Sequence, residues 1–387
     1  MAARRAERLV GLVRSLDSFH GDGSCKAQCL PLLVDGQNVG LVSPAVLAQV
    51  KNHPDVFHVL PASGRAGLGV GGGGGDGGGH RDGGRAGGGE ECVVLSPALG
   101  SYERRSEAVD AVLRQWKALN LFVTLRGWRD EMYQVSARFY DKPVMKMERS
   151  ATCLFGVKQY GVHMNGYTHH PSHGLCLWIG RRSESKQTYP GKLDNMAAGG
   201  LAVGVGIKET LVKEAAEEAG IPACLAERAV PVGTVSYTHE NERGIFPECQ
   251  FVYDLEIPDD FTPHAADGEM QDFYLWPVDK AGPCCPQCLS FGASVLEEMT
   301  SGDFKPNCAL VTLDFLIRHG LVDPDTGTAP PVGPAGETAP PVGPSGPRGY
   351  AASRFVWSLL RRGRVAPTEL EPPRLLHVVP AVQVRDV

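Results

Sequence analysis

Hydrophobic residues recur with strand or helix spacing in two long stretches of the chain, and these stretches predict its folded parts. In the first stretch, apolar runs flank Asp35 and Gly36, a dipeptide typical of a hairpin turn, and an amphipathic pattern predicts a helix over residues 103–120. In the second stretch, residues 149–320, strand patterns lie on both sides of a glycine-rich loop over residues 199–206 and a charged helix that follows it. The strands predicted there cover residues 161–170, 174–183, 230–241, 248–257 and 272–278, and a closing helix covers 308–320. This mixture predicts an α/β (α+β) protein.

Two segments break these patterns and are expected not to pack. Residues 64–90 are mostly glycine, and residues 321–348 carry the sequence TAPPVGP twice. Neither has enough apolar surface to offset the loss of chain entropy, so both are predicted to be disordered. The predicted division is an N-terminal α+β domain over 1–148 that contains the glycine-rich insertion, a second domain over 149–320, a Pro-rich linker over 321–348 and a C-terminal tail over 349–387.

The beginning of the chain combines arginines with apolar residues at helical spacing. This pattern fits either a short transit peptide or the first helix of the folded protein. Glu7 and Asp17 favour the helix, because transit peptides contain few acidic residues. The expected location is therefore cytoplasmic, with a plastid or a mitochondrion left open.

The composition argues against two classes of partner. The net charge is −6 and no basic stripe with interleaved aromatic residues occurs, so no nucleic-acid polymer is expected as a partner. No run of about 20 apolar residues occurs either, so no membrane span is expected. A small molecule remains as the expected partner, and a homodimer is left open.

The helix predicted after the glycine-rich loop carries an acidic face. At about 100° per residue, Glu214, Glu217 and Glu218 fall on one side of it, with only Lys213 at the edge of that side. Like charges at these spacings repel by a few tenths of a kcal/mol per pair, and a divalent cation removes that cost. Mg²⁺ prefers carboxylate oxygens and bridges them to substrate phosphates. The helix therefore predicts a Mg²⁺ site, with Mn²⁺ as the other candidate ion.

The loop before this helix fits the same chemistry. Gly199 and Gly200 allow the backbone to approach a ligand closely, and backbone N–H groups of such a loop can bind phosphate oxygens. Lys213 adds a positive charge beside the carboxylates. These three residues are therefore candidates for binding a diphosphate substrate.

The loop and helix together resemble the Nudix box, whose pattern is G-x5-E-x7-R-E-U-x-E-E-x-G-U, with U an aliphatic residue. The matching residues are Gly199, Glu214, Glu217, Glu218, Gly220 and Ile221. Val205 stands where the pattern has its first Glu, and Lys213 stands where it has Arg. Other stretches, among them GWRDEMYQV, LWIGRRS and YPGKLDNMAAGG, resemble the plant and fungal Nudix proteins related to thiamine pyrophosphokinase, in which both departures are typical.

The resemblance implies a Nudix fold, a mixed-sheet α/β/α sandwich, preceded here by a small α+β domain. It also implies a pyrophosphohydrolase that converts thiamine diphosphate, or its oxo or oxy analogues, to the monophosphate and phosphate. By the same resemblance Glu214 and Glu218 are metal ligands. Glu217 is either a third ligand or the catalytic residue that polarises water.

Three further residues are candidates with two interpretations each. Glu269 is the candidate general base on a later loop, and a solvated acidic loop explains it equally well. His163 and Asn165 lie on a predicted strand and are candidates for recognising the organic part of the substrate. A structural hydrogen-bonding role explains these two residues equally well.

Two other functions are left open. A nucleotide-sanitising Nudix hydrolase acting on 8-oxo-dGDP would use the same metal helix with a different pocket, but such proteins generally lack the N-terminal domain. A non-catalytic binder with a Nudix fold is supported only by Val205. The retained carboxylates argue against it, because a binder has little reason to keep their mutual repulsion.

Overall fold

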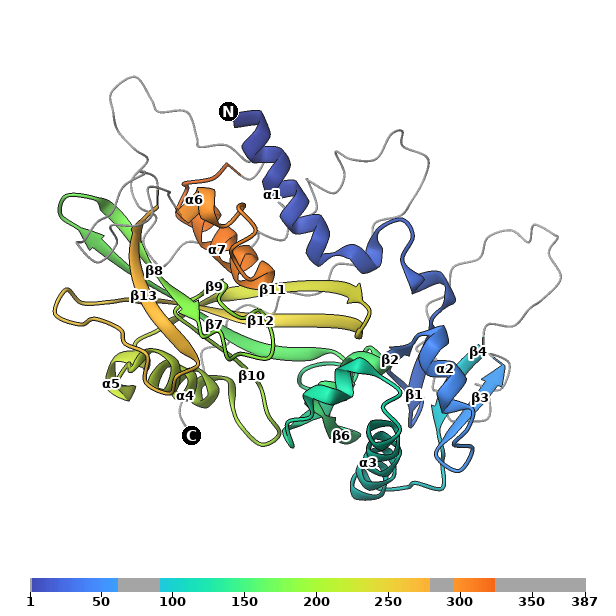
Figure 1. Cartoon of the computed structure of the whole chain (residues 1–387). Helices are drawn as coiled ribbons and strands as arrows, with labels where there is room; N and C mark the ends of the chain where they lie inside the picture. The colour runs from blue at the N-terminus through green and yellow to red at the C-terminus, as the bar shows by residue number, and fades with distance from the viewer. Residues whose placement is uncertain (1, 62–90, 279–294, 324–387) are drawn as a thin grey trace, which may run out of the picture.

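The computed structural model describes residues 2–61, 91–278 and 295–323, which form two modules that lie side by side (Figure 1). The predicted insertion over 64–90, residues 324–348 of the predicted linker and the predicted tail over 349–387 lie outside the described residues.

The first module is built on a four-stranded sheet. Its elements are β1 (Leu30–Val34), β2 (Gln37–Val42), α2 (Pro44–Val50), β3 (Phe57–Pro61), β4 (Glu91–Leu95) and α3 (Tyr102–Ala118). The strand order is β2-β1-β4-β3, with β1 and β4 parallel and the other neighbours antiparallel. The predicted hairpin turn is confirmed, since Asp35 and Gly36 join β1 to β2 with φ of 49° and 73°, as a two-residue turn of this kind requires.

A short ribbon completes this module and extends toward the second one. It consists of β5 (Met132–Val135) and β6 (Met145–Glu148), which pair antiparallel between the 3₁₀ helices η4 (Val123–Gly127) and η5 (Arg149–Phe155). Leu154 and Phe155 of η5 and the following Val157 are buried in the same core as α3. The buried core of the first module therefore includes residues up to Val157.

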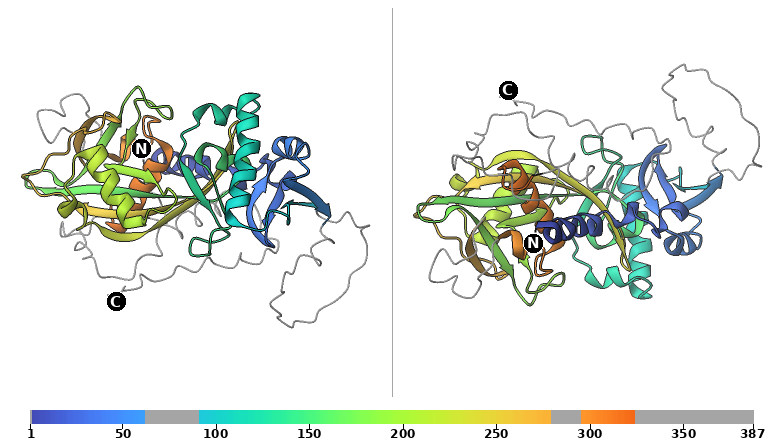
Figure 2. Two further views of the ribbon diagram at one scale, coloured as in Figure 1. Left: turned by 90° about the horizontal axis from the view of Figure 1, so that it is seen from below. Right: turned by 90° about the horizontal axis from the view of Figure 1, so that it is seen from above.

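The second module is a seven-stranded mixed sheet between two layers of helices. Its elements are β7 (Gln159–His170), β8 (Gly174–Arg182), β9 (Leu193–Asp194), β10 (Ala197–Gly200), α4 (Ile207–Ala219), α5 (Ala223–Ala226), β11 (Val230–Asn241), β12 (Gly244–Glu256), β13 (Met270–Pro277), α6 (Val295–Glu298) and α7 (Pro306–Arg318). The order is β11-β12-β7-β8-β13, with β10 paired to β7 and β9 to β8, and only β12 and β7 run parallel. Helices α4 and α5 cover one face, and α6 and α7 cover the other (Figures 1 and 2). The predicted α+β class with a mixed-sheet sandwich is confirmed.

The first helix of the chain belongs to the second module. In α1 (Ala2–Leu16), Leu9, Val13 and Leu16 are buried in one core with α7. The short 3₁₀ helices η1 (Ser18–His20) and η2 (Cys25–Gln28) then lead to β1. The predicted division placed this helix in the first domain, whereas its packing is with the second. The burial of these leucines and valine supports a helix of the folded protein over a transit peptide.

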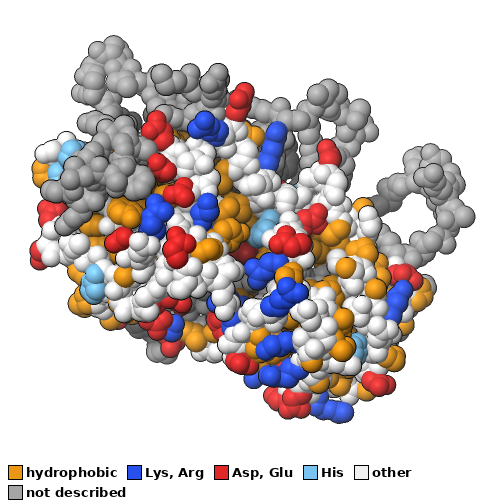
Figure 3. Space-filling model, in the orientation of Figure 1, with side chains coloured by type: hydrophobic (Ala, Val, Ile, Leu, Met, Phe, Trp, Pro, Cys, Tyr) orange, Lys and Arg blue, Asp and Glu red, His pale blue; other side chains and the backbone are white. Residues whose placement is uncertain are grey.

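Acidic and basic side chains are interspersed over the face of the molecule drawn in Figure 3. Within the described ranges, no helix is both long and apolar enough to cross a bilayer.

Candidate active site

Helix α4 is fixed by its two ends and by its apolar side. At its start, the Glu209 carboxylate accepts the N–H of Gly206 at 3.4 Å. At its end, Gly220 takes the left-handed φ of 65°, and the Ile221 N–H donates to the Ala215 carbonyl at 3.0 Å. Leu211, Ala215 and Ala219 are buried in the core between the helix and the sheet, whereas Ala216, which the sequence pattern placed on this side, is exposed. The apolar side thereby determines where the acidic residues lie.

The carboxylate of Glu214 lies directly on strand β10. A methyl group added to Gly199 would lie 2.2 Å from Glu214 Cδ, so only glycine fits at this position. A methyl group on Gly200 would lie 1.6 Å from the Tyr133 hydroxyl oxygen. The space above these two glycines, which the sequence assigned to a ligand, is therefore occupied by Glu214 and Tyr133.

The three predicted metal ligands differ in their surroundings. Glu218 is 4% exposed, and its Oε2 accepts the Ala198 N–H at 2.8 Å. The Glu214 side chain is 18% exposed, and Lys213 Nζ lies 3.4 Å from its Oε1. Glu217 is 46% exposed and accepts a shorter hydrogen bond of 2.6 Å from the same ammonium group. The structure thus brings Glu214 and Glu218 together on adjacent turns and turns Glu217 toward Lys213.

The carboxyl groups of Glu214 and Glu218 both have raised pKa values. Burial raises the pKa of Glu218 to about 8, with a smaller contribution from the charge of Asp194. Burial also raises the pKa of Glu214, and the charges of Glu217 and Glu269 add to this effect while Lys213 opposes it. Both groups therefore favour the protonated form in the protein alone, and a bound cation would favour their ionised form.

The donor atoms fit a divalent cation of the Mg²⁺ type. Glu214 and Glu218 provide hard anionic oxygens one helical turn apart, the ligand type that Mg²⁺ and Mn²⁺ prefer. In the described part of the chain, no three His, Cys, Asp or Glu side chains converge closely enough to enclose an ion. Glu217 completes such a set only by leaving Lys213.

The predicted general base lies within electrostatic range of these carboxylates. Glu269 immediately precedes β13, and Lys186 donates a hydrogen bond to its carboxylate. Its charge contributes to the raised pKa of Glu214, although the two residues are far apart in the sequence. Burial opposes its ionisation, but Lys186 and then Arg182 outweigh burial and lower the pKa of Glu269. The carboxylate is therefore ionised at neutral pH and able to accept a proton.

His163 and Asn165 lie on the opposite face of the sheet. They are 3% and 2% exposed, and Cys308 of α7 lies against the His163 ring. His163 Nδ1 is 2.9 Å from Asn195 Oδ1, and Asn165 donates to Asp254 at 3.0 Å. Burial lowers the pKa of His163 to about 4, so its ring is neutral at neutral pH. The structure does not bring these residues to the carboxylates, and their contacts favour the structural role.

The first module contributes two side chains that the sequence analysis missed. Tyr133 of β5 places its hydroxyl over Gly200, and Arg149 lies with its Cζ 5.4 Å from the centre of the Tyr133 ring. Arg149 also donates to Glu131 at 2.8 Å, and its charge interacts with that of Glu214. A positive charge from the first module therefore stands beside the carboxylates of the second.

The glycine-rich loop itself is attached to the first module. The Val203 N–H donates to the Met132 carbonyl of β5 at 2.9 Å, and the Leu201 N–H donates to the Tyr160 carbonyl at 2.9 Å. The loop is thus held on one side by β5 and on the other by β7.

Comparisons with known proteins identify the family. Nudix hydrolase 24, chloroplastic, of Arabidopsis thaliana is 34% identical over 318 residues, which span 82% of this chain and 75% of that protein. The chain belongs to the Nudix hydrolase family. Nudix hydrolase 20, chloroplastic, of the same plant is 42% identical over 234 residues, which span 60% of this chain and 58% of that protein.

Two further matches were found for this Nudix protein. Residues 9–159 match a family described as a domain of unknown function (DUF4743). Among solved structures, the MutT protein from Methanosarcina mazei Go1 is 18% identical, covers 41% of this chain and 92% of its own, and has a TM-score of 0.28.

Behind the Nudix helix α4 lies a buried group of charges. Asp194 of β9 binds Arg182 at 2.8 Å and Lys305 at 3.2 Å, and the Cys308 thiol donates to it at 2.5 Å. Asp194 and Arg182 are 3% and 5% exposed in their side chains. Because Asp194 also acts on Glu218, this group sets the electrostatic potential on the inner side of the site.

Proposed function

We propose that this Nudix protein hydrolyses the diphosphate group of small organic diphosphates with the help of Mg²⁺ or a similar divalent ion. The observation that carries the proposal is the pair Glu214 and Glu218, held one turn apart with raised pKa values beside Glu269 and Arg149. The names of the two Arabidopsis relatives support the reaction class.

Thiamine diphosphate and its oxo or oxy analogues are the substrates that we propose within this class, with the monophosphate and phosphate as products. Support comes from the resemblance of several stretches to Nudix proteins related to thiamine pyrophosphokinase, among them GWRDEMYQV, which forms β5 and the residues before it. These stretches include Tyr133, whose hydroxyl contacts Gly200 of β10.

Each residue of the site has a role in this reaction. Glu214 and Glu218 would hold the cation, which would neutralise phosphate charge and activate water. Glu217 joins them as a ligand or polarises the water once it leaves Lys213, whose ammonium group is then free to bind a phosphate oxygen. Glu269 accepts the proton from water, and Lys186 holds its carboxylate in position. Gly199 and Gly200 allow Glu214 and Tyr133 to approach β10.

The test is phosphate release with Mg²⁺ from thiamine diphosphate, oxythiamine diphosphate and 8-oxo-dGDP. Glu218→Gln should abolish release, whereas Glu227→Gln, an exposed control just after α5, should not change it. Release by the Glu218→Gln protein at the wild-type rate would refute the assignment of this helix.

The substrate panel separates the remaining functions. Preference for the thiamine compounds supports the proposed substrate. Preference for 8-oxo-dGDP moves the protein to nucleotide sanitation with the same chemistry, and no release from any diphosphate supports a binder.

A further inference from the structure

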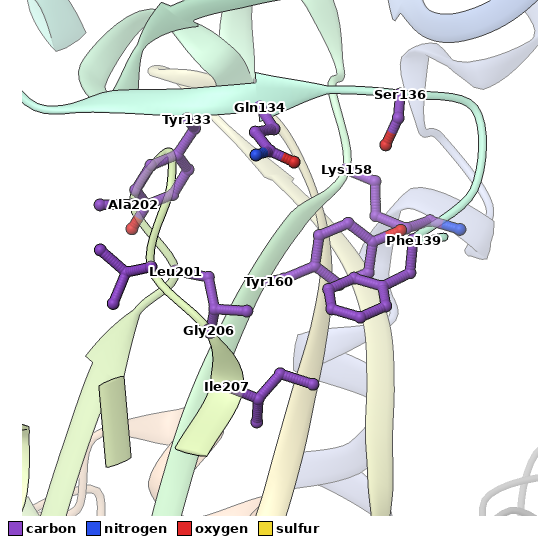
Figure 4. Close-up of a pocket in the computed structure, with 11 residues that line it drawn as sticks. Tyr133, Gln134, Ser136, Phe139, Lys158, Tyr160, Leu201, Ala202, Gly206 and Ile207 are labelled. Carbon is purple, nitrogen blue, oxygen red and sulfur yellow. The ribbon is translucent and has the colours of Figure 1, made fainter. Parts of the chain in front are cut away.

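A pocket lies between the two modules, at the end of the glycine-rich loop (Figure 4). One wall comes from β5 and the segment after it, a second from the beginning of β7, and a third from the loop and the first residues of α4. Its aromatic, aliphatic and basic lining residues include Tyr133, Phe139, Lys158, Tyr160, Leu201 and Val205.

The pocket is suited to a flat ring. Phe139 and Tyr160 come from different modules, and their ring centres are 4.8 Å apart at an angle of 63°. Phe251 packs against both, with its ring centre 4.9 Å from that of Phe139 and 6.3 Å from that of Tyr160. Leu201 adds an apolar side chain from the loop. Rigid aromatic walls of this kind stack on planar ligands.

Val205 gives the pocket a wall without charge. It occupies the position at which the Nudix pattern has its first Glu, and here it lines the pocket. A carboxylate at this position would carry negative charge into the aromatic pocket, whereas valine leaves the wall apolar.

Lys158 supplies the polar group of the pocket. In the described ranges no hydrogen bond or ion pair joins its ammonium group to another residue, and Figure 4 shows this end passing beside Phe139. An ammonium group at the rim of an aromatic pocket donates to an acceptor, such as a carbonyl oxygen, on a ring bound inside.

The pocket and the carboxylates are joined by three successive residues. Leu201 lines the pocket, Gly200 touches the Tyr133 hydroxyl, and Gly199 touches Glu214. Two residues of extended chain span about 7 Å, so the pocket opens close to the carboxylates. Arg149 stands along this path, since its Cζ would lie 3.5 Å from a methyl group on Gly200.

We propose that this pocket binds a planar heteroaromatic ring at the organic end of the substrate, with Lys158 donating to an acceptor on the ring and Arg149 binding the phosphates between the ring and the carboxylates. The part that concerns the phosphates rests on the proposed diphosphate hydrolysis. The first module is then a direct part of substrate recognition.

The experiment measures ring binding separately from hydrolysis. Binding of thiamine monophosphate and 8-oxo-dGMP to the full chain is followed by titration calorimetry in EDTA. Hydrolysis is followed with 8-oxo-dGDP and with methyl diphosphate, which has no ring. The variants are Tyr160→Leu, Lys158→Met and Lys158→Arg, and the control is Tyr140→Leu, which removes an 83% exposed ring next to Phe139 but outside the pocket.

Tyr160→Leu should lower the binding affinity for both monophosphates about tenfold, which is the loss expected for one stacking contact. Lys158→Met should lower the affinity for 8-oxo-dGMP, which carries ring carbonyls, more than the affinity for thiamine monophosphate. Lys158→Arg should restore the affinity for 8-oxo-dGMP, because it keeps a positively charged donor. For both pocket variants kcat/KM should fall further with 8-oxo-dGDP than with methyl diphosphate. Tyr140→Leu should behave as wild type.

The pocket assignment is overturned if Tyr160→Leu and Lys158→Met bind both monophosphates as wild type does, or if wild type binds neither. An equal fall of kcat/KM with and without a ring also overturns it. Failure of the two proposals can be told apart. A wild-type protein that binds the monophosphates but releases no phosphate keeps the pocket and loses the hydrolysis, and the reverse result keeps the hydrolysis alone.

Discussion

The pH dependence of folding should reveal the buried carboxylate Glu218. Its side chain is 4% exposed and its pKa is about 8 in the folded protein, against 4.5 for an ordinary Glu. The folded state therefore holds this proton more tightly than the unfolded state does. The resulting stability is fully present below pH 4.5 and is lost as the pH rises through 8. The difference of 8 − 4.5, at about 1.4 kcal/mol per pH unit, gives a loss of roughly 5 kcal/mol.

Glu218→Gln should remove this loss. The amide has nearly the same shape, keeps an oxygen that accepts the Ala198 N–H, and does not ionise. The stability of the variant relative to wild type should thus rise by roughly 5 kcal/mol between pH 4.5 and 8. The assay is urea unfolding in EDTA at several pH values and constant ionic strength. Glu217→Gln is the matched control, because it makes the same substitution on the same helix at a side chain that is 46% exposed.

Mg²⁺ provides the second arm of this test. At pH 8 the ion should stabilise wild type by an amount that grows with its concentration, and it should stabilise the Glu218→Gln protein far less. A stability difference between variant and wild type that stays constant from pH 5 to pH 9 would refute the reasoning about burial. Equal stabilisation of both proteins by Mg²⁺ would refute the reasoning about the ligand.

Three further predictions concern the surroundings of the site. Gly199→Ala should displace the Glu214 carboxylate by more than about 1 Å and lower phosphate release about 100-fold, and wild-type turnover would contradict the contact. Arg182→Met should lower the free energy of unfolding by about 3–5 kcal/mol, since it removes a partner of buried Asp194; a urea midpoint equal to wild type would show that Lys305 suffices. Leu9→Ala should cost about 2–5 kcal/mol in the same assay, and no change would mean that α1 is not docked on α7.

The acidic helix could be predicted from the sequence because its determinants are local. Carboxylates three and four residues apart must share a helix face, and a glycine in left-handed conformation must end the helix. The structure places these residues on α4, which ends at Ala219 directly before Gly220. Local reasoning also identified Gly199 and Gly200 as points of close approach. It could not identify what approaches, because Glu214 and Tyr133 reach them through the fold.

Which side chains of a buried strand face the site could not be predicted in the same way. Strand β7 is covered by helices on both faces, so alternation along it does not show which face carries the chemistry. His163 and Asn165 were candidates on that strand, and they point to α7 instead of α4. The docking of α1 and the contact of Arg149 with the second module are likewise set by packing between distant segments. Spacing along the chain does not specify such contacts.

The hydrogen bond from Val203 to Met132 has a consequence for how this protein loses activity on heating. A glycine-rich loop has many accessible conformations, and a fixed point near its middle removes a share of them beyond what the bond from Leu201 to β7 removes. That fixed point belongs to the first module, whereas the Nudix helix draws its own stability from the second. Softening of the first module should therefore release the loop while α4 is still folded. Inactivation would then precede the melting of α4 and would be reversible on cooling.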